Sequence, residues 1–207
     1  DLADRRCHGE TISCHRCGPQ LWARVRCDDA IGGVSSGSSG NVEQRGEEAL
    51  RSALELLDRG SIIMVKATGG YNLVCRADTD EPVLALRELK HRPSKPFAVL
   101  FASMEQLRRH CAVSGAEEEL LCSAARPIVL LDRLRDGVCG GAEGLPSGGT
   151  CPEGKPLSLF LAARGGTLGA FLPSLGIYAL LAERFPLVVT SCNEEGSPIL
   201  FRDGDAL

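Results

Sequence analysis

The chain has 207 residues, 43% of them hydrophobic and 24% charged, a composition that suits a globular protein with a sizeable core. Its formal net charge is −4 and it has only two Tyr, one Trp and six Phe, which argues against an extended nucleic-acid groove. No apolar run approaches the roughly 20 residues that span a bilayer, and the charged N-terminus DLADRRCHGE lacks the apolar region of a secretory signal. We therefore expect a cytoplasmic protein.

The first part of the chain is rich in Cys, His and Arg and contains one CxxC pair, Cys14 and Cys17. Two thiolates three positions apart suit a turn that presents both sulfurs to one tetrahedral zinc ion, so the pair forms half of a zinc site. The other two ligands could come from the first 27 residues or from upstream of the chain. A redox pair or two idle thiols remain alternatives, and we expect the other thiols to be reduced.

A Gly/Ser-rich stretch, GGVSSGSSGN, indicates a linker over residues 32–41 because it lacks the apolar content to pack. We expect a partial zinc-finger segment over 1–31 and a main domain over 42–207. A Gly/Pro-rich insertion is predicted over 132–166. Both ends of the chain look truncated.

Strand and helix patterns intermix throughout the main domain. Apolar residues at helical spacing predict a helix that begins at residue 42, with Gly60 as its C-cap. The strand SIIMV follows, then a Gly-Gly turn, a second apolar stretch, and a helix, EPVLALRELKHR, that Pro93 stops. The later elements, in chain order, are the strand PFAVLF, the helix SMEQLRRHCAV with a Ser103–Gln106 capping box, the helix GAEEELLCSAA, the apolar stretches RPIVLL and TLGAFLP, the helix LGIYALLAERF and the strand PLVVTSCN.

Three cations, Lys90, Arg92 and Lys95, gather where the second helix ends and a buried strand begins. Positive charges held at the rigid start of a buried strand suggest a site for a small anion. Lys and Arg are also common at solvated helix ends, because they interact favourably with the helix dipole. The cluster alone leaves both interpretations open.

Small polar residues, Ser191 and Asn193, follow the last predicted strand. Such residues usually cap the next turn, but in an open α/β sheet ligands bind beyond the carboxyl ends of strands. A separate motif, GGTCPEGKP, resembles a phosphate loop, yet Pro156 stands where a Ser or Thr must bind magnesium. We reject the phosphate-loop interpretation for that reason.

Six blocks occur in one order along the chain: DRRCHGETISCHRCGP, VKATGGYNLVCRA, LRELKHRPSKPFAVL, RPIVLL, TLGAFLP and LVVTSCNEEGSPI. Together they resemble the hydrogenase maturation carbamoyltransferase family HypF, over the end of its zinc-finger region and most of its YrdC-like domain. The resemblance implies a YrdC-like α/β fold, a twisted mixed sheet with flanking helices around a concave, positively charged ATP site.

The resemblance also implies which residues bind. In that superfamily a Lys-x-Arg and a Ser-x-Asn meet at the nucleotide, and the catalytic residues expected from them are Lys90, Arg92, Ser191 and Asn193. The two cations would hold the phosphates and the small carboxy anion, and the other two would form neutral hydrogen bonds with the phosphates. Further nucleotide- or substrate-binding residues are expected at Lys66, Thr68, Gly69, Gly70, Tyr71, Lys95 and Arg126.

The implied reaction forms carbamoyl-adenylate and pyrophosphate from carbamate and ATP, with Mg²⁺ bridging the phosphates. No general base is needed, because the carbamate oxygen is already ionised. A structural Zn²⁺ is expected at Cys14 and Cys17, in a site that is incomplete in this chain. The expected protein partner is a hydrogenase maturation protein with an acceptor cysteine.

The chain departs from the family at Asn72, where His is common, and at Arg76, where Asp is usual. HypF proteins also carry acylphosphatase and transferase domains, and we expect no match to either within these 207 residues. Alternatives are threonylcarbamoyl-AMP synthesis for tRNA modification, a non-catalytic zinc and RNA-binding module, and an inactive fragment. The zinc-finger remnant favours the HypF reaction, and the acidic charge balance disfavours RNA.

The resemblance leads to a geometric prediction. Ser191 and Asn193 should lie across one cleft from Lys90 and Arg92, although the two pairs are far apart in the sequence. Replacing either cation by Ala should remove adenylate formation and leave the fold intact.

Overall fold

The computed structural model describes most of the chain, namely residues 20–26, 41–134, 155–161, 166–193 and 196–206. The chain divides into two compact units, Asp1–Leu56 and Leu57–Leu207. No helix in the described part is long and apolar enough to cross a membrane.

In the first unit, β1 (Trp22–Arg26) and β2 (Asn41–Arg45) form an antiparallel pair. Helix α1 (Gly46–Asp58) follows β2 directly. The helix predicted to begin at residue 42 in fact begins at Gly46, four residues later, and residues 41–45 form a strand. The physical reason is the period-2 pattern of NVEQR, in which buried or half-buried Val42 and Gln44 alternate with exposed neighbours.

The predicted C-cap of this helix is confirmed. Gly60 has a φ of 82°, in the left-handed region that glycine adopts without steric cost. Its N–H donates to the carbonyl of Leu57 at 3.0 Å, which satisfies one of the last helical carbonyls.

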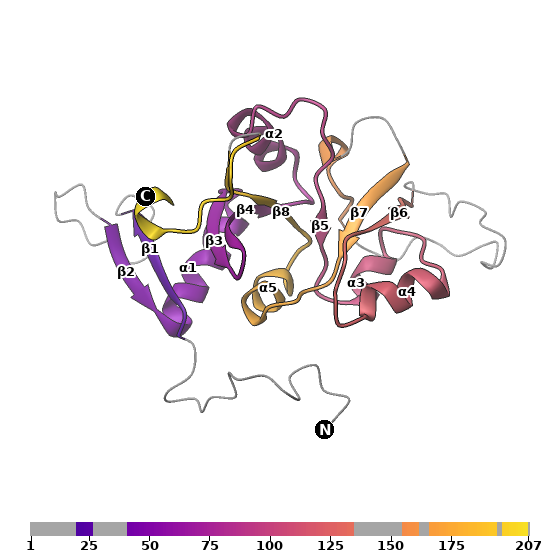
Figure 1. Ribbon diagram of the computed structural model, residues 1–207, viewed down its shortest axis with the longest axis horizontal. Helices are drawn as coiled ribbons and strands as arrows, with labels where there is room; N and C mark the ends of the chain where they lie inside the picture. The colour runs from indigo at the N-terminus through magenta and orange to yellow at the C-terminus, as the bar shows by residue number, and fades with distance from the viewer. Residues whose placement is uncertain (1–19, 27–40, 135–154, 162–165, 194–195, 207) are drawn as a thin grey trace, which may run out of the picture. The chain divides into compact units, whose positions relative to one another are not determined.

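The second unit is built on a six-stranded sheet in the order β3-β4-β8-β5-β7-β6 (Figure 1). Only β5 and β7 are parallel, and every other neighbouring pair is antiparallel. The predicted mixed α/β sheet is thus confirmed. The strands are β3 (Ile63–Ala67), β4 (Gly70–Arg76), β5 (Val99–Leu100), β6 (Val129–Asp132), β7 (Thr167–Phe171) and β8 (Leu187–Ser191).

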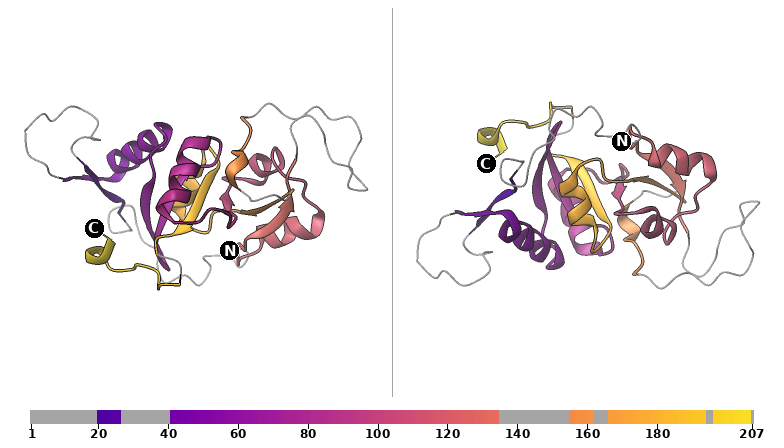
Figure 2. Two further views of the ribbon diagram at one scale, coloured as in Figure 1. Left: turned by 90° about the horizontal axis from the view of Figure 1, so that it is seen from above. Right: turned by 90° about the horizontal axis from the view of Figure 1, so that it is seen from below.

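Helices cover both faces of this sheet. Helix α2 (Asp80–Leu89) lies on one face and α5 (Gly176–Ala182) on the other, as the views from above and below show (Figure 2). Helices α3 (Met104–Arg108) and α4 (Gly115–Cys122) lie on the same side as α5 (Figure 1). A 3₁₀ turn, η2 (Leu159–Leu161), contacts α2, and a short helix, α6 (Asp203–Ala206), follows β8.

The predicted capping box at α3 forms only in part. The Ser103 hydroxyl accepts from the N–H of Gln106 at 3.2 Å, but the Gln106 side chain accepts from the N–H of Ala102. A complete box forms at α4 instead, between Ser114 and Glu117. Both helices therefore begin where a Ser side chain satisfies an otherwise free N–H.

The last strand in the sequence, β8, lies inside the sheet between β4 and β5. Its residues Leu187 and Val188 are fully buried in the core. The register pairs Ser191 with Asn72, so the carboxyl end of β8 lies beside the start of β4. Because β5 runs antiparallel to β8, the start of β5 lies at the same end of the sheet.

Arg76, one of the departures from the family, lies at the other end of β4 and pairs with Leu187. Its guanidinium donates to both carboxylate oxygens of Asp78 at 2.8 Å and to Asp58 at 2.9 Å. It also stacks over Phe185, at 4.4 Å from the ring centre. Arg76 therefore stabilises the fold, and its identity does not alter the end of the sheet where Ser191 lies.

Candidate functional site

The end of α2 turns the chain so that Lys90 points inward. The N–H of His91 donates to the carbonyl of Glu88, and the N–H of Arg92 donates to the carbonyl of Arg87, both at 3.0 Å. These two bonds, with a φ of 50° at His91, form a Schellman motif in which His91 occupies the position that glycine usually takes. The exposed His91 thus separates two cations of the predicted site.

We expect His91→Gly to stabilise the chain by about 1 kcal/mol, because a left-handed φ is costly for a residue with a Cβ and not for glycine. Urea unfolding should show a higher midpoint with an unchanged slope. His91→Ala is the matched control, since it removes the imidazole and keeps the Cβ, and it should show no gain. Equal stability of the Gly and Ala variants would contradict this account.

Lys90 is only 6% exposed, which is unusual for a lysine. Its ammonium donates to the carbonyls of Ser191 and Asn193, the first at 2.8 Å, and to Asn193 Oδ1 at 3.3 Å. An ammonium has three donor protons, and here three oxygens at the end of β8 lie within hydrogen-bond distance of it. Lys90 therefore fixes the conformation of the residues that follow this strand.

Ser191 and Asn193 are bonded to one another. The hydroxyl of Ser191 donates to Asn193 Oδ1 at 2.6 Å, and Asn193 Nδ2 donates to the carbonyl of Ser197 at 2.7 Å. Burial raises the pKa of the intervening Cys192 above its usual range, so its thiol stays protonated at neutral pH. Residues 191–193 thus present polar groups and no thiolate at neutral pH.

Arg92 approaches β8 beside Lys90. Its guanidinium lies 3.4 Å from the hydroxyl of Thr190, and its Nε is buried without a hydrogen-bond partner among the described atoms. No described carboxylate pairs with it. A guanidinium has five N–H donors and remains charged in proteins, so Arg92 has donors left for an anion.

The four residues expected to be catalytic thus meet at one end of β8. Lys90 contacts Ser191 and Asn193 directly, whereas Arg92 contacts the preceding residue, Thr190. That the two pairs face each other across one cleft stays a prediction. Thr190 pairs with Leu73 and Ser191 with Asn72, and successive residues of a strand point to opposite faces. Arg92 contacts Thr190 and therefore lies on one face of the sheet, whereas the side chain of Ser191 leaves the strand on the other face.

The β3–β4 hairpin contains five of the remaining predicted residues. Lys66 pairs with Tyr71 in the register, and both side chains bond to the carboxylate of Asp203, Tyr71 at 2.9 Å. The bond to Asp203 raises the pKa of Lys66, so this ammonium stays charged and carries a counter-ion from the chain itself. Thr68 and Gly69 form the exposed turn of the hairpin.

The segment after β8 passes directly over Gly70. The N–H of Tyr71 donates to the carbonyl of Leu200 at 2.7 Å. Gly70 has a φ of 126°, and a Cβ at this position would lie 2.6 Å from the Leu200 carbonyl oxygen and from Ile199 Cγ2. The close approach of the two segments therefore requires glycine here.

We expect Gly70→Ala to destabilise the chain by about 1–3 kcal/mol, because the added methyl group meets backbone in a strained conformation. Gly69→Ala is the matched control, since a Cβ at Gly69 has nothing within 4 Å and its φ is not in the left-handed region. Thermal unfolding of both variants tests this. Equal melting temperatures would show that the segment at residues 199–200 does not pack on the hairpin.

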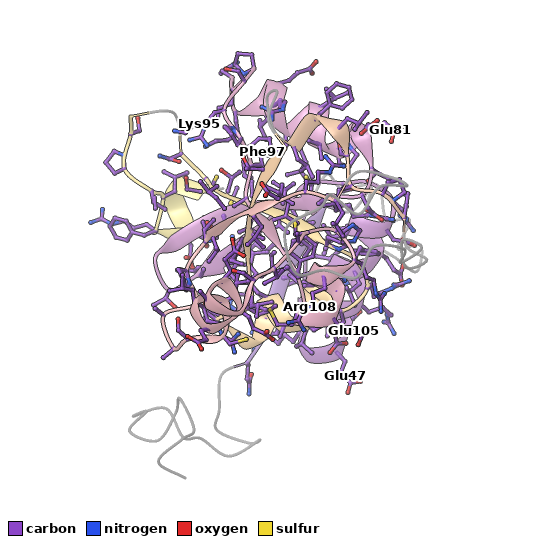
Figure 3. The ribbon with its side chains drawn as sticks, turned by 90° about the vertical axis from the view of Figure 1, so that its right-hand side faces the viewer. Glu47, Glu81, Lys95, Phe97, Glu105 and Arg108 are labelled. Carbon is purple, nitrogen blue, oxygen red and sulfur yellow. The ribbon has the colours of Figure 1, made fainter. Side chains whose placement is uncertain are left out.

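The two predicted residues that remain are Lys95 and Arg126. Lys95 is exposed on the segment between α2 and β5, on the α2 side of the sheet (Figure 3). Arg126 precedes β6, which is three strands away from β8, or about 14 Å at usual strand spacing. The register also places Arg126 toward the amino end of β8, where it donates to the carbonyl of Leu121 at 3.2 Å. The structure does not bring Arg126 to the other predicted residues.

Four residues that contact the site are not among those predicted from the sequence. They are Arg87, Tyr178, Thr190 and Asp203, and Tyr178 accepts from the Asn72 side chain at 2.8 Å. A signal for Arg87 exists, because it lies four positions after buried Val83 and so falls on the apolar face of α2. Nothing in the sequence marks Asp203 or Tyr178, whose contacts join distant segments.

The proposed zinc ligands Cys14 and Cys17 lie outside the described residues, as does almost all of the predicted linker. Within the described residues, no group of three or more His, Cys, Asp or Glu side chains could hold a metal ion.

Two family profiles match the chain. One, for Sua5/YciO/YrdC and described as "Telomere recombination", matches residues 55–207, and the other, described as "HypF finger", matches residues 1–23. Both agree with the resemblance seen in the sequence blocks.

Individual known proteins are also similar to this chain in sequence and in structure. Carbamoyltransferase HypF of Rhodobacter capsulatus is 36% identical over 208 residues, which cover 100% of this chain and 23% of that protein. A crystal structure of full-length HypF in the phosphate- and nucleotide-bound form has a TM-score of 0.71 and 32% identity, covering 100% of this chain and 23% of that one. Threonylcarbamoyl-AMP synthase of Bos taurus is 32% identical over 101 residues, 48% of this chain and 37% of that protein.

Proposed function

We propose that this chain, which belongs to the Sua5/YciO/YrdC family and joins to it a HypF-type finger, forms carbamoyl-adenylate from ATP and carbamate. The observation that supports this most directly is Arg92. It is a charged side chain beside the end of β8 whose buried Nε has no hydrogen-bond partner among the residues that the structure describes, in a chain that resembles HypF along its whole length.

In the proposed reaction a carbamate oxygen attacks the α-phosphorus of ATP, and the bond from that phosphorus to the bridging oxygen of the β-phosphate breaks. Pyrophosphate leaves with the electron pair of that bond. Both reactants are anions that repel each other in water, so the task of the protein is to neutralise charge and to align the reactants.

The described residues divide this task. Arg92 donates to phosphate or carbamate oxygens through a planar fork that suits both anions. Lys90 holds the turn at Ser191 and Asn193 in place and adds a positive charge next to it. A magnesium ion bound with ATP would neutralise further phosphate charge.

The remaining parts of the proposal concern the longer proteins that this chain resembles. We propose that the carbamoyl group passes to an acceptor cysteine of a hydrogenase maturation partner. We also propose that Cys14 and Cys17 bind a structural Zn²⁺, since the segment matched by the HypF finger profile contains both.

A second candidate is threonylcarbamoyl-AMP synthesis, which the match to the Bos taurus synthase favours. Exchange of labelled pyrophosphate into ATP distinguishes the two, because only a substrate that forms an adenylate supports exchange. The arms are ammonium carbamate, sodium bicarbonate, and sodium bicarbonate with L-threonine. We expect exchange with carbamate alone. Exchange that needs both bicarbonate and threonine would assign the second function, and no exchange in any arm would contradict both.

A further inference from the structure

Arg87 is a buried arginine on α2 that the proposed chemistry does not use. It is 9% exposed, and its pKa is lowered because burial disfavours the charged form. No described carboxylate pairs with its guanidinium. Burying a charge without a counter-ion costs free energy. The contacts of Arg87 should therefore show what compensates for that cost.

The guanidinium of Arg87 binds four backbone carbonyls. Its Nη1 donates to Arg92 O at 2.8 Å and to Lys95 O at 3.1 Å. Its Nε donates to Phe160 O at 2.7 Å and its Nη2 to Leu161 O at 3.3 Å. A single side chain thus connects the basic segment 92–95 with η2.

The ring of Phe97 packs against this guanidinium, and a backbone bond of Phe97 joins the same two segments. The guanidinium lies over the ring of Phe97, at 4.8 Å from the centroid, and the N–H of Phe97 donates to the carbonyl of Leu161 at 2.9 Å. Figure 3 shows Phe97 and Lys95 on the same segment, on the α2 side of the sheet, with Glu105 and Arg108 on the opposite side.

The Schellman motif explains why residue 87 has this effect on residue 92. In that motif the third residue from the helix end and the second residue beyond it usually make an apolar contact. Here they are Arg87 and Arg92, and the contact is a hydrogen bond from the guanidinium of Arg87 to the carbonyl of Arg92. The backbone of Arg92 is therefore held at both its N–H and its C=O by the same residue.

We propose that Arg87 is a positioning residue for the nucleotide site: it fixes the backbone from which Arg92 reaches its anion. This inference rests on the proposed function, in which Arg92 binds the nucleotide. Lysine could not replace Arg87 in this role, because its three donors leave from one nitrogen and cannot span carbonyls on two segments.

A double-mutant cycle on the affinity for Mg-ATP, measured by calorimetry on the full chain, tests the proposal. Arg92→Ala should lower the affinity about 10- to 100-fold, and Arg87→Met about 10-fold, as expected for lost hydrogen bonds to a charged group. The double variant should bind within about twofold of Arg92→Ala alone, because the position of residue 92 no longer matters once its side chain is gone. The proposal would be overturned if the affinity losses of the two single variants multiplied in the double variant. It would also be overturned if Arg87→Met bound Mg-ATP as tightly as the parent.

Arg133 provides a matched control. It donates to the carbonyls of Leu157 and Ser158, just before η2, and within the described residues it forms no hydrogen bond to residues 92–95. Arg133→Met should therefore leave the Mg-ATP affinity within about twofold of the parent. A loss as large as that of Arg87→Met would show that any loosening of residues 157–161 is enough, and would overturn the specific role of Arg87.

Two further measurements separate this inference from folding and from the proposed function. If Arg87→Met does not fold, Arg87→Lys replaces it in the cycle with the same expectation. Hydrogen exchange at the N–H of Phe97 should become faster in the Arg87 variant, and exchange as slow as in the parent would count against the proposal. A parent chain that binds Mg-ATP without pyrophosphate exchange would refute the proposed function and still allow the cycle, whereas no Mg-ATP binding would refute both.

Discussion

Arg92→Ala is expected to lower carbamate-dependent pyrophosphate exchange about 10²- to 10³-fold, the usual effect of removing one preorganised donor from a charged transition state. The fold should remain intact, because the side chain is half-buried, makes one long contact to Thr190 and fills no part of the core. The measurement is the exchange rate per folded molecule, with circular dichroism to verify folding.

The control for this variant is Arg108→Ala. Arg108 lies on α3, on the face of the sheet opposite to α2, where it forms an exposed ion pair with Glu118 at 2.5 Å. An exposed pair of this kind contributes little to stability, so exchange should be unchanged. If Arg92→Ala kept near-parental exchange, the assignment of Arg92 to anion binding would be wrong.

Lys90→Ala is expected to have two effects, because the ammonium of Lys90 bonds to the end of β8 and so contributes to stability as well as to the proposed reaction. Removing the ammonium leaves the carbonyls of Ser191 and Asn193 without their donor at a position where the lysine is only 6% exposed. We expect a loss of about 2–3 kcal/mol in the free energy of unfolding, in the range for lost bonds to a charged group. Exchange should fall as well, because the turn at Asn193 loses its fixed conformation.

Lys90→Met separates these effects, since it keeps the apolar stem and removes only the ammonium. It should be nearly as destabilised as Lys90→Ala if the three hydrogen bonds dominate, and nearly as stable as the parent if packing of the stem dominates. Urea unfolding of the two variants decides between these outcomes. Parental stability in both would contradict the role of Lys90 at the end of β8.

Local pattern predicted most of the elements, because helical period and short apolar runs depend on neighbouring residues. It could not predict the order of strands, in which β8 lies between β4 and β5. Nor did it predict β2, where Gly46 separates a short alternating strand from a helix that looks continuous in the sequence. Strand order depends on long-range pairing, which periodicity does not encode.

For the site, the proximity of Lys90 to Ser191 and Asn193 followed from resemblance and not from local physics. Contacts such as those of Asp203 with Lys66 or of Tyr178 with Asn72 depend on segments that meet only in the folded chain. Arg126 shows that resemblance can also mislead. Its sequence block suggested a nucleotide- or substrate-binding role, but the register of β6 and β7 places it away from Ser191 and Asn193.

The place of β8 in the sheet also bears on how the protein is made. As the chain leaves the ribosome, the β3–β4 hairpin and the β5–β7–β6 group emerge first, and no strand pairing joins them until β8 is synthesised and enters between β4 and β5. Pairings over such long sequence separations form slowly, because the loop must close before the contacts stabilise it. We therefore expect the strands of the nascent chain to form two separately paired groups until β8 arrives. The residues at the carboxyl end of β8 would then come together only when the sheet itself is completed.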